Sequence, residues 1–217
     1  DNTMYVNGTV SGVVALADNN IIIAYPGATV DTENLEDNSG NTAASTQFYI
    51  NGEVYMTAYG ANGTTVASVM GKETFEVEGY QTPDMSKNSN LTEYKSWFTD
   101  AGMTQNLAVS ATMQYTSSVY TKVNPISVDN IRVSIGEGLQ VYVDGVRVTT
   151  PYLDGTQAYV GDHVIEVTIS PSYTGEVVIT FNGQTIQNGG TFTITSEMAN
   201  PTADEVVLSV TSQLSIN

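Results

Sequence analysis

The 217-residue chain contains no cysteine, which removes disulfides, thiolate metal ligands and cysteine nucleophiles from consideration. Basic residues are also scarce: six lysines and arginines stand against 23 aspartates and glutamates, and the formal net charge is −17. A chain with this charge repels a phosphate backbone or an anionic lipid surface over most of its area. We therefore expect no nucleic-acid partner.

Long apolar runs are missing too. The longest is "IIIAY" from residue 21 to residue 25, whereas a spanning helix needs about 20 apolar residues. We therefore expect no membrane span.

The motifs of common enzymes are also absent, because no P-loop, nucleophile elbow, dinucleotide fingerprint or zinc-protease motif occurs. The single histidine, His163, would have to serve any Ser-His-Asp triad. Strand alternation places His163 on the same face as Ile165 and Val167, which favours a half-buried structural histidine. We predict no enzymatic activity and name no catalytic residue.

Strand and turn patterns are abundant. Residues 141 to 150, "VYVDGVRVTT", place Asp-Gly between two runs that alternate apolar and polar residues, which is typical of a tight hairpin. The pattern recurs, and its four turns are Asn7-Gly8, Asn51-Gly52, Asp144-Gly145 and Asn182-Gly183. We predict an all-β fold, an immunoglobulin-like or jelly-roll-like antiparallel β-sandwich.

One stretch has a different period. After Asn90, a candidate cap, the apolar residues Leu91, Tyr94, Trp97 and Phe98 follow at helical spacing, and Gly102 ends the run. This pattern predicts a single short helix near residues 91–101. By contrast, "ETFEVEGY" from residue 73 alternates and predicts a strand.

A domain boundary is expected where Pro125 interrupts two strand patterns. Residues 1–124 would form an N-terminal β-sandwich domain and residues 125–217 a C-terminal immunoglobulin-like one. The first domain begins with a strand-forming segment without charge, residues 2–16, which we consider a candidate donor strand. Val6, Val10 and Val14 are the candidate donor residues, which would enter the core of a neighbouring subunit.

Residues 134–170 resemble a known module. The V-x-V-D-G hairpin of Val141 to Gly145 is followed by Thr150-Pro151 and by G-x-H-x-I-x-V from Gly161 to Val167. This order resembles the PEGA-type and related immunoglobulin-like β-sandwich modules of prokaryotic surface proteins. The resemblance implies a scaffolding or binding role without chemistry.

Three kinds of ligand or modification site can be named. The acidic run of Asp31, Glu33, Glu36 and Asp37 offers hard oxygen ligands and is a candidate calcium site, although a solvated loop has the same composition. No other cofactor is expected. Asn7, Asn62 and Asn90 fit the N-glycosylation pattern. Trp97 and thirteen tyrosines could stack on a glycan ligand, although a tryptophan at this spacing is more often part of the core.

The chain starts at Asp1 without a methionine, and we expect an exported protein that is secreted, extracellular or on the cell surface. In class, size and start it is similar to the subunits of extracellular filaments built by donor-strand complementation, such as TasA-like fibre proteins and archaeal pili. This similarity implies a structural subunit that polymerises with copies of itself. The alternatives are a surface adhesin or carbohydrate-binding module, and a virion decoration or fibre protein.

Overall fold

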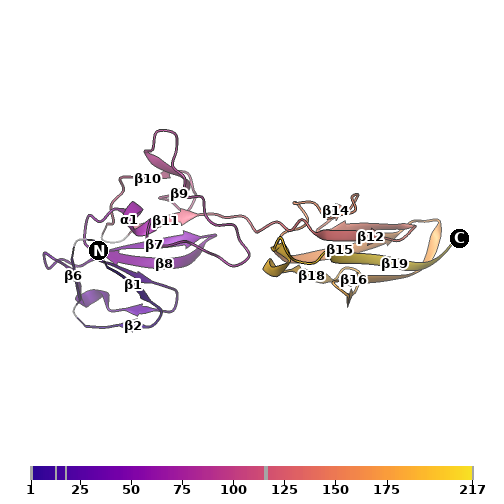
Figure 1. Cartoon of the computed structure of the whole chain (residues 1–217), viewed down its shortest axis with the longest axis horizontal. Coiled ribbons are helices and arrows are strands. Elements are labelled where there is room, and N and C mark those ends of the chain that lie inside the picture. The colour runs from indigo at the N-terminus through magenta and orange to yellow at the C-terminus, as the bar shows by residue number, and fades with distance from the viewer. Residues whose placement is uncertain (1, 13, 18, 115–116, 217) are drawn as a thin grey trace. The chain divides into compact units, whose positions relative to one another are not determined.

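A computed structural model describes residues 2–12, 14–17, 19–114 and 117–216 (Figure 1). Asp1, from which the expectation of export was argued, lies outside the described residues. The structure is 49% strand and 6% helix, so the all-β prediction is confirmed. The chain divides into two compact units: residues 1–76 with 82–123, and residues 77–81 with 124–217.

Unit 1 is built on a seven-stranded sheet. Its strands in spatial order are β1 (Thr3–Val6), β4 (Ile21–Ala24), β8 (Glu53–Gly60), β7 (Ala44–Ile50), β11 (Ser117–Thr121), β9 (Glu93–Phe98) and β10 (Asn106–Ala108). The central strand β7 alternates buried and half-buried residues along its whole length. Phe48 of β7 packs at 5.9 Å between ring centroids against Trp97, and both side chains are fully buried. This alternation follows from the period-2 pattern that predicted the strand.

The predicted helix near residues 91–101 is wrong, because this region forms strand β9. Tyr94 and Trp97 are both buried, and their spacing of three coincides with a β-bulge in the pairing of β9 with β10. Asn106 pairs with Phe98 and Ala108 pairs with Glu93, so two steps on β10 oppose five on β9. The extra residues in β9 imitate a helical period. The short α-helix of the structure is α1 (Val66–Met70), where the Thr65 side chain accepts a hydrogen bond from the Ser68 N–H at 3.2 Å.

The described residues between Thr3 and Asp37 form two parallel turns of a coil. Strands β1, β2 (Thr9–Val10) and β3 (Val14–Leu16) pair with β4, β5 (Thr29–Val30) and β6 (Leu35–Asp37), respectively. A 3₁₀ turn, η1 (Thr32–Asn34), precedes β6. The pairs are 18, 20 and 21 residues apart in sequence, as Thr3 with Ile21, Thr9 with Thr29 and Val14 with Leu35 show. The first turn therefore stacks on the second.

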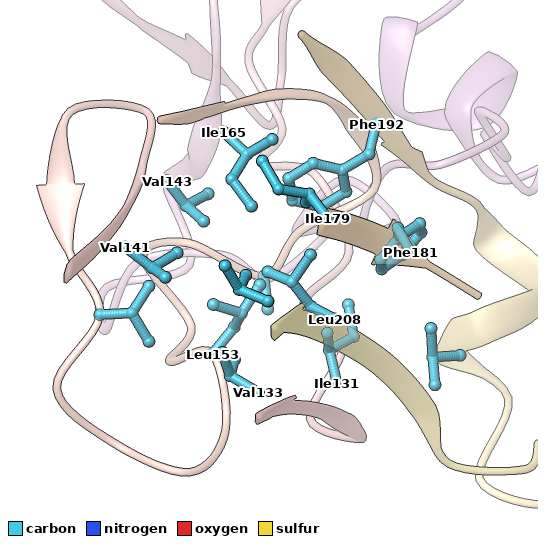
Figure 2. Packing of buried hydrophobic residues seen from close by; sticks show 14 of the residues in the cluster. Ile131, Val133, Val141, Val143, Leu153, Ile165, Ile179, Phe181, Phe192 and Leu208 are labelled. Atoms are coloured by element: carbon cyan, nitrogen blue, oxygen red, sulfur yellow. The ribbon is translucent and has the colours of Figure 1, made fainter. Parts of the chain in front are cut away.

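Unit 2 is a sandwich of two four-stranded sheets. The strands of the first are β12 (Ile131–Ile135), β19 (Val206–Ile216), β16 (Tyr173–Phe181) and β17 (Gln184–Ile186). Those of the second are β14 (Val146–Arg147), β13 (Leu139–Val143), β15 (Gly161–Ile169) and β18 (Thr191–Ile194), and a 3₁₀ turn, η2 (Ser196–Ala199), follows β18. Both sheets contribute to one hydrophobic core, in which Val141 and Ile165 of one sheet meet Ile179 and Leu208 of the other (Figure 2).

Three of the four predicted hairpins are confirmed. Asn51-Gly52, Asp144-Gly145 and Asn182-Gly183 have positive φ at both positions and join antiparallel strands, as a type I′ turn requires. The hairpin at Asn7-Gly8 is wrong, because β1 and β2 pair with β4 and β5 and not with each other. Ser11 and Gly12 interrupt the second arm, whereas β4 offers β1 four consecutive buried residues.

The chain passes between the units three times: after Glu76, after Gln81 and after Val123. The last crossing lies beside the predicted boundary at Pro125, but the second unit also contains residues 77–81. The Gln81 N–H donates to the Asn124 carbonyl at 2.8 Å, and the Ile126 N–H donates to the Gly79 carbonyl at 2.9 Å. The strand predicted from residue 73 is wrong, because Phe75 is buried in unit 1 while Val77 belongs to unit 2.

Candidate functional site

The candidate donor segment forms the first turn of the coil in unit 1. Val6 is 6% exposed, and Val10 and Val14 are half-buried. Together with Leu16 of the same segment, they share a small hydrophobic cluster with residues of the second turn and of the sheet, among them Ile22, Ala24, Leu35 and Tyr59. The structure therefore gathers all three candidate donor residues in one cluster, within their own chain.

Among its described residues, the backbone of this segment pairs with one stretch of chain only. β1, β2 and β3 each pair with a single strand, and these three partners lie between Ile21 and Asp37. At the two ends of the β2–β5 pair, the Thr29 N–H donates to the Gly8 carbonyl at 2.9 Å and the Asp31 N–H donates to the Val10 carbonyl at 2.9 Å. The opposite edge of β1 has no neighbouring strand among the described residues, and Met4 and Tyr5 are each 51% exposed there.

The sequence contains a signal for the coil that its strand patterns alone did not reveal. "NGTV" from Asn7 and "PGATV" from Pro26 occupy equivalent places in the two turns, with Thr9 beside Thr29 and Val10 beside Val30. Self-similarity at a period of about 20 residues is typical of stacked parallel turns. With two copies only, and one extra residue in the second, the repeat is short.

A row of aromatic side chains runs from the segment into the core of unit 1. Tyr5 stacks on Tyr25 at 6.5 Å, and Tyr25 contacts the edge of Tyr55 at 6.3 Å. The Tyr25 hydroxyl donates to the Glu73 carboxylate. Burial, followed by that hydrogen bond and the charge of Glu73, raises the pKa of Tyr25 well above its ordinary value. Phe75 continues the row, with its ring 5.4 Å from Tyr55 and 5.0 Å from Trp97. Trp97 is fully buried and does not line a sugar-binding surface.

His163 is held as part of the core of unit 2. Its ring is fully buried and lies on the same strand face as Ile165 and Val167, as predicted, but more deeply than expected. Nδ1 lies 2.7 Å from Oδ2 of Asp144, and Nε2 lies 2.7 Å from the Tyr159 carbonyl oxygen. The ring is therefore held at both nitrogens. Sequence reasoning missed Asp144 as its partner, because the residue was assigned to a turn.

The candidate calcium ligands are not brought together. Among the described residues no group of three or more His, Cys, Asp or Glu side chains is placed to hold a metal ion. Asp37 accepts hydrogen bonds from the backbone N–H groups of Ser39 and Asn41 at 2.8 and 3.0 Å, and Asp31 accepts one from the Asn34 side chain at 2.8 Å. The hydrogen bond from Asn41 is the main cause that lowers the pKa of Asp37. Glu33 is exposed and Glu36 is half-buried.

The three glycosylation candidates, Asn7, Asn62 and Asn90, are all exposed and lie in turns or bends. Exposure permits modification, and whether any of them carries a glycan stays a prediction.

An uncharged groove opens in unit 2 between the edge strands β17 and β18. Its volume is about 590 Å³, and Phe181 and Phe192 contribute to its wall. The remaining wall carries Gln184, Gln187, Thr191 and Thr193 among its polar residues, and none of its residues is charged. Such a surface offers hydrogen bonds to a neutral ligand, while Phe181 and Phe192 are themselves buried.

Comparison with protein-family models, with curated proteins and with solved structures gave no match. The similarity of residues 134–170 to PEGA-type modules therefore stays a prediction. Among the helices of the described residues, none is long and apolar enough to cross a membrane.

Proposed function

We propose that this protein is a structural subunit of an extracellular filament, and that it polymerises by donating its N-terminal strands to a neighbouring copy. The observation that carries the proposal is the way residues 3–16 are attached. Three short strands make all their backbone pairs with residues 21–37, and the side chains complete one small cluster.

The same contacts can form between two chains. If residues 3–16 of one copy paired with residues 21–37 of the next, the backbone pairs between the two turns would be kept, as in domain swapping, while the connecting turn, where the Asn20 N–H donates to the Ala17 carbonyl, would open. The buried Val6 contributes about 1.5 kcal/mol or more in either arrangement, and the half-buried Val10 and Val14 contribute less. Because the donating and accepting surfaces of a subunit differ, this exchange continues from copy to copy and gives an open chain.

The experiment uses the cysteine-free chain and the exposed pair Thr9 and Thr29, which lie opposite each other in register. A Thr9→Cys variant and a Thr29→Cys variant are mixed during assembly and oxidised. Neighbouring strands bring the two positions within the range of a disulfide, so donation predicts disulfide-linked dimers of one Thr9→Cys and one Thr29→Cys chain.

The matched control replaces Thr29→Cys with Gln184→Cys, an exposed position in unit 2. The proposal is wrong if the Thr9/Thr29 mixture links no better than the control, while the double variant Thr9→Cys/Thr29→Cys forms only the bond within one chain.

A second candidate function, a carbohydrate-binding module, is favoured by the uncharged groove between β17 and β18. Its Gln and Thr side chains beside Phe181 and Phe192 suit a neutral sugar. Binding to a neutral glycan array that is lost in a Gln184→Ala/Gln187→Ala variant would support this function.

A further inference from the structure

The first sheet of unit 2 has four strands at one end and two at the other. β19 has 11 residues, but β12 pairs only with Val206 to Val210. β16 has nine residues, but β17 pairs only with Ile179 to Phe181. Beyond these positions, residues 173–178 and 211–216 pair with each other alone among the described residues. We call this two-stranded extension, residues 173–178 with 211–216, the ribbon; its β19 strand runs on to the C-terminal end of unit 2 (Figure 1).

The hydrogen-bonding groups on the free edge of the ribbon can be assigned. The Val206 N–H donates to the Asn130 carbonyl and the Val210 carbonyl accepts from Gly136, so even-numbered residues of β19 face the side of β12. The Val207 carbonyl accepts from Asn182 and faces β16. By the period of a strand, the backbone groups of residues 212, 214 and 216 point to the edge that β12 leaves uncovered.

The β19 strand of the ribbon lacks the features that protect exposed edges. From Val206 to Ile216 the strand contains no proline and no charged residue, although proline and charge are the usual means of blocking edge pairing. Ile216 is 79% exposed and Val178 is 51% exposed. A two-stranded ribbon is only marginally stable in water, whereas three or more strands are stable.

We propose that a second copy of this chain pairs with the free β19 edge of the ribbon, through antiparallel contact of residues 211–216 with the same residues of its partner. The two ribbons together make four strands, which is the width of the sheet at its other end. The β16 edge suits self-pairing less well, because Glu176 is exposed there and two copies would bring these carboxylates together. Although the chain has a net charge of −17, no residue of β19 is charged, so two β19 edges meet without charge repulsion between their side chains. The interface is independent of strand donation by the N-terminal segment.

The geometry fixes which side chains oppose each other across this interface. Because even-numbered residues carry the edge hydrogen bonds on both copies, odd-numbered residues face odd-numbered ones in any antiparallel register. Gln213 and Ser215 are exposed and odd-numbered. Like charges at these positions therefore oppose each other, and unlike charges attract.

The test is made in a full chain whose N-terminal segment is locked in place by the Thr9→Cys/Thr29→Cys disulfide, formed in dilute solution, so that strand donation cannot contribute. Sedimentation equilibrium measures the dimer dissociation constant of this chain and of two variants. These are Gln213→Glu/Ser215→Glu and Gln213→Lys/Ser215→Lys.

We expect the locked chain to dimerise, each charged variant to dimerise at least about tenfold more weakly, and an equal mixture of the two to form heterodimers. A backbone test complements this: Ser212→Pro removes an N–H at the free edge and abolishes dimerisation, while Ser212→Ala keeps that N–H and dimerises. A locked chain that stays monomeric at millimolar concentration, or charged and proline variants that dimerise as the locked chain does, would overturn the proposal.

Discussion

At the scale of single residues, His163 shows what a sequence pattern predicts and what it does not. Alternation along residues 161–169 placed the ring on the buried face, and the structure confirms that face. The alternation could not predict the contact with Asp144. This residue lies 19 residues away and comes into contact with His163 only through the pairing of β13 with β15. Contacts of this kind depend on strand register, which a single sequence does not fix.

Removing the carboxylate of Asp144 should destabilise unit 2. Asp144→Asn leaves the buried His163 ring without its charged acceptor, and we expect the free energy of unfolding to fall by about 1–3 kcal/mol. The matched control is Asp162→Asn, because Asp162 is exposed and accepts a hydrogen bond from Thr193 rather than from the histidine. Urea denaturation measures both variants, and equal losses of stability in the two would contradict the assigned role of Asp144.

At the scale of elements, the hairpins were the most predictable feature, because their turns need positive φ and Asn-Gly or Asp-Gly supplies it locally. The failures have non-local causes. The spacing of Tyr94 and Trp97 reflects a bulge opposite β10, and the spacing of Phe75 and Val77 reflects a chain that leaves one unit for the other. The parallel coil was missed because its partners are about 20 residues apart and join through no tight turn.

The segment of residues 77–81 gives a test at this scale. Gly79 has φ +79°, and an added Cβ would lie 2.9 Å from Cγ1 of Val160. Gly79→Ala should therefore lower the stability of unit 2 by about 1–3 kcal/mol through backbone strain and steric contact together.

The control is Gly183→Ala, where φ is +77° but no atom lies within 4 Å of the added Cβ. Thermal unfolding compares the two variants. The docking of residues 77–81 onto unit 2 is contradicted if Gly79→Ala is no more destabilising than Gly183→Ala.

At the scale of the whole molecule, the strand and turn patterns predicted an all-β chain, and that prediction is confirmed. The division into two units lies close to the proline-marked boundary, with residues 77–81 as the part that composition does not reveal. The function proposed for the N-terminal segment is assembly of the subunits into a filament. It depends on whether residues 3–16 pair within one copy or between copies, and identical contacts serve both arrangements.

Negative-stain electron microscopy of the concentrated full chain, beside a chain that lacks residues 1–16, tests that claim most directly. Strand donation predicts filaments from the full chain and none from the truncated one, and a synthetic peptide of residues 1–16 should restore the stability of the truncated chain without restoring filaments. Filaments of normal appearance from the truncated chain, or only single particles from the full chain in its native medium, would contradict it.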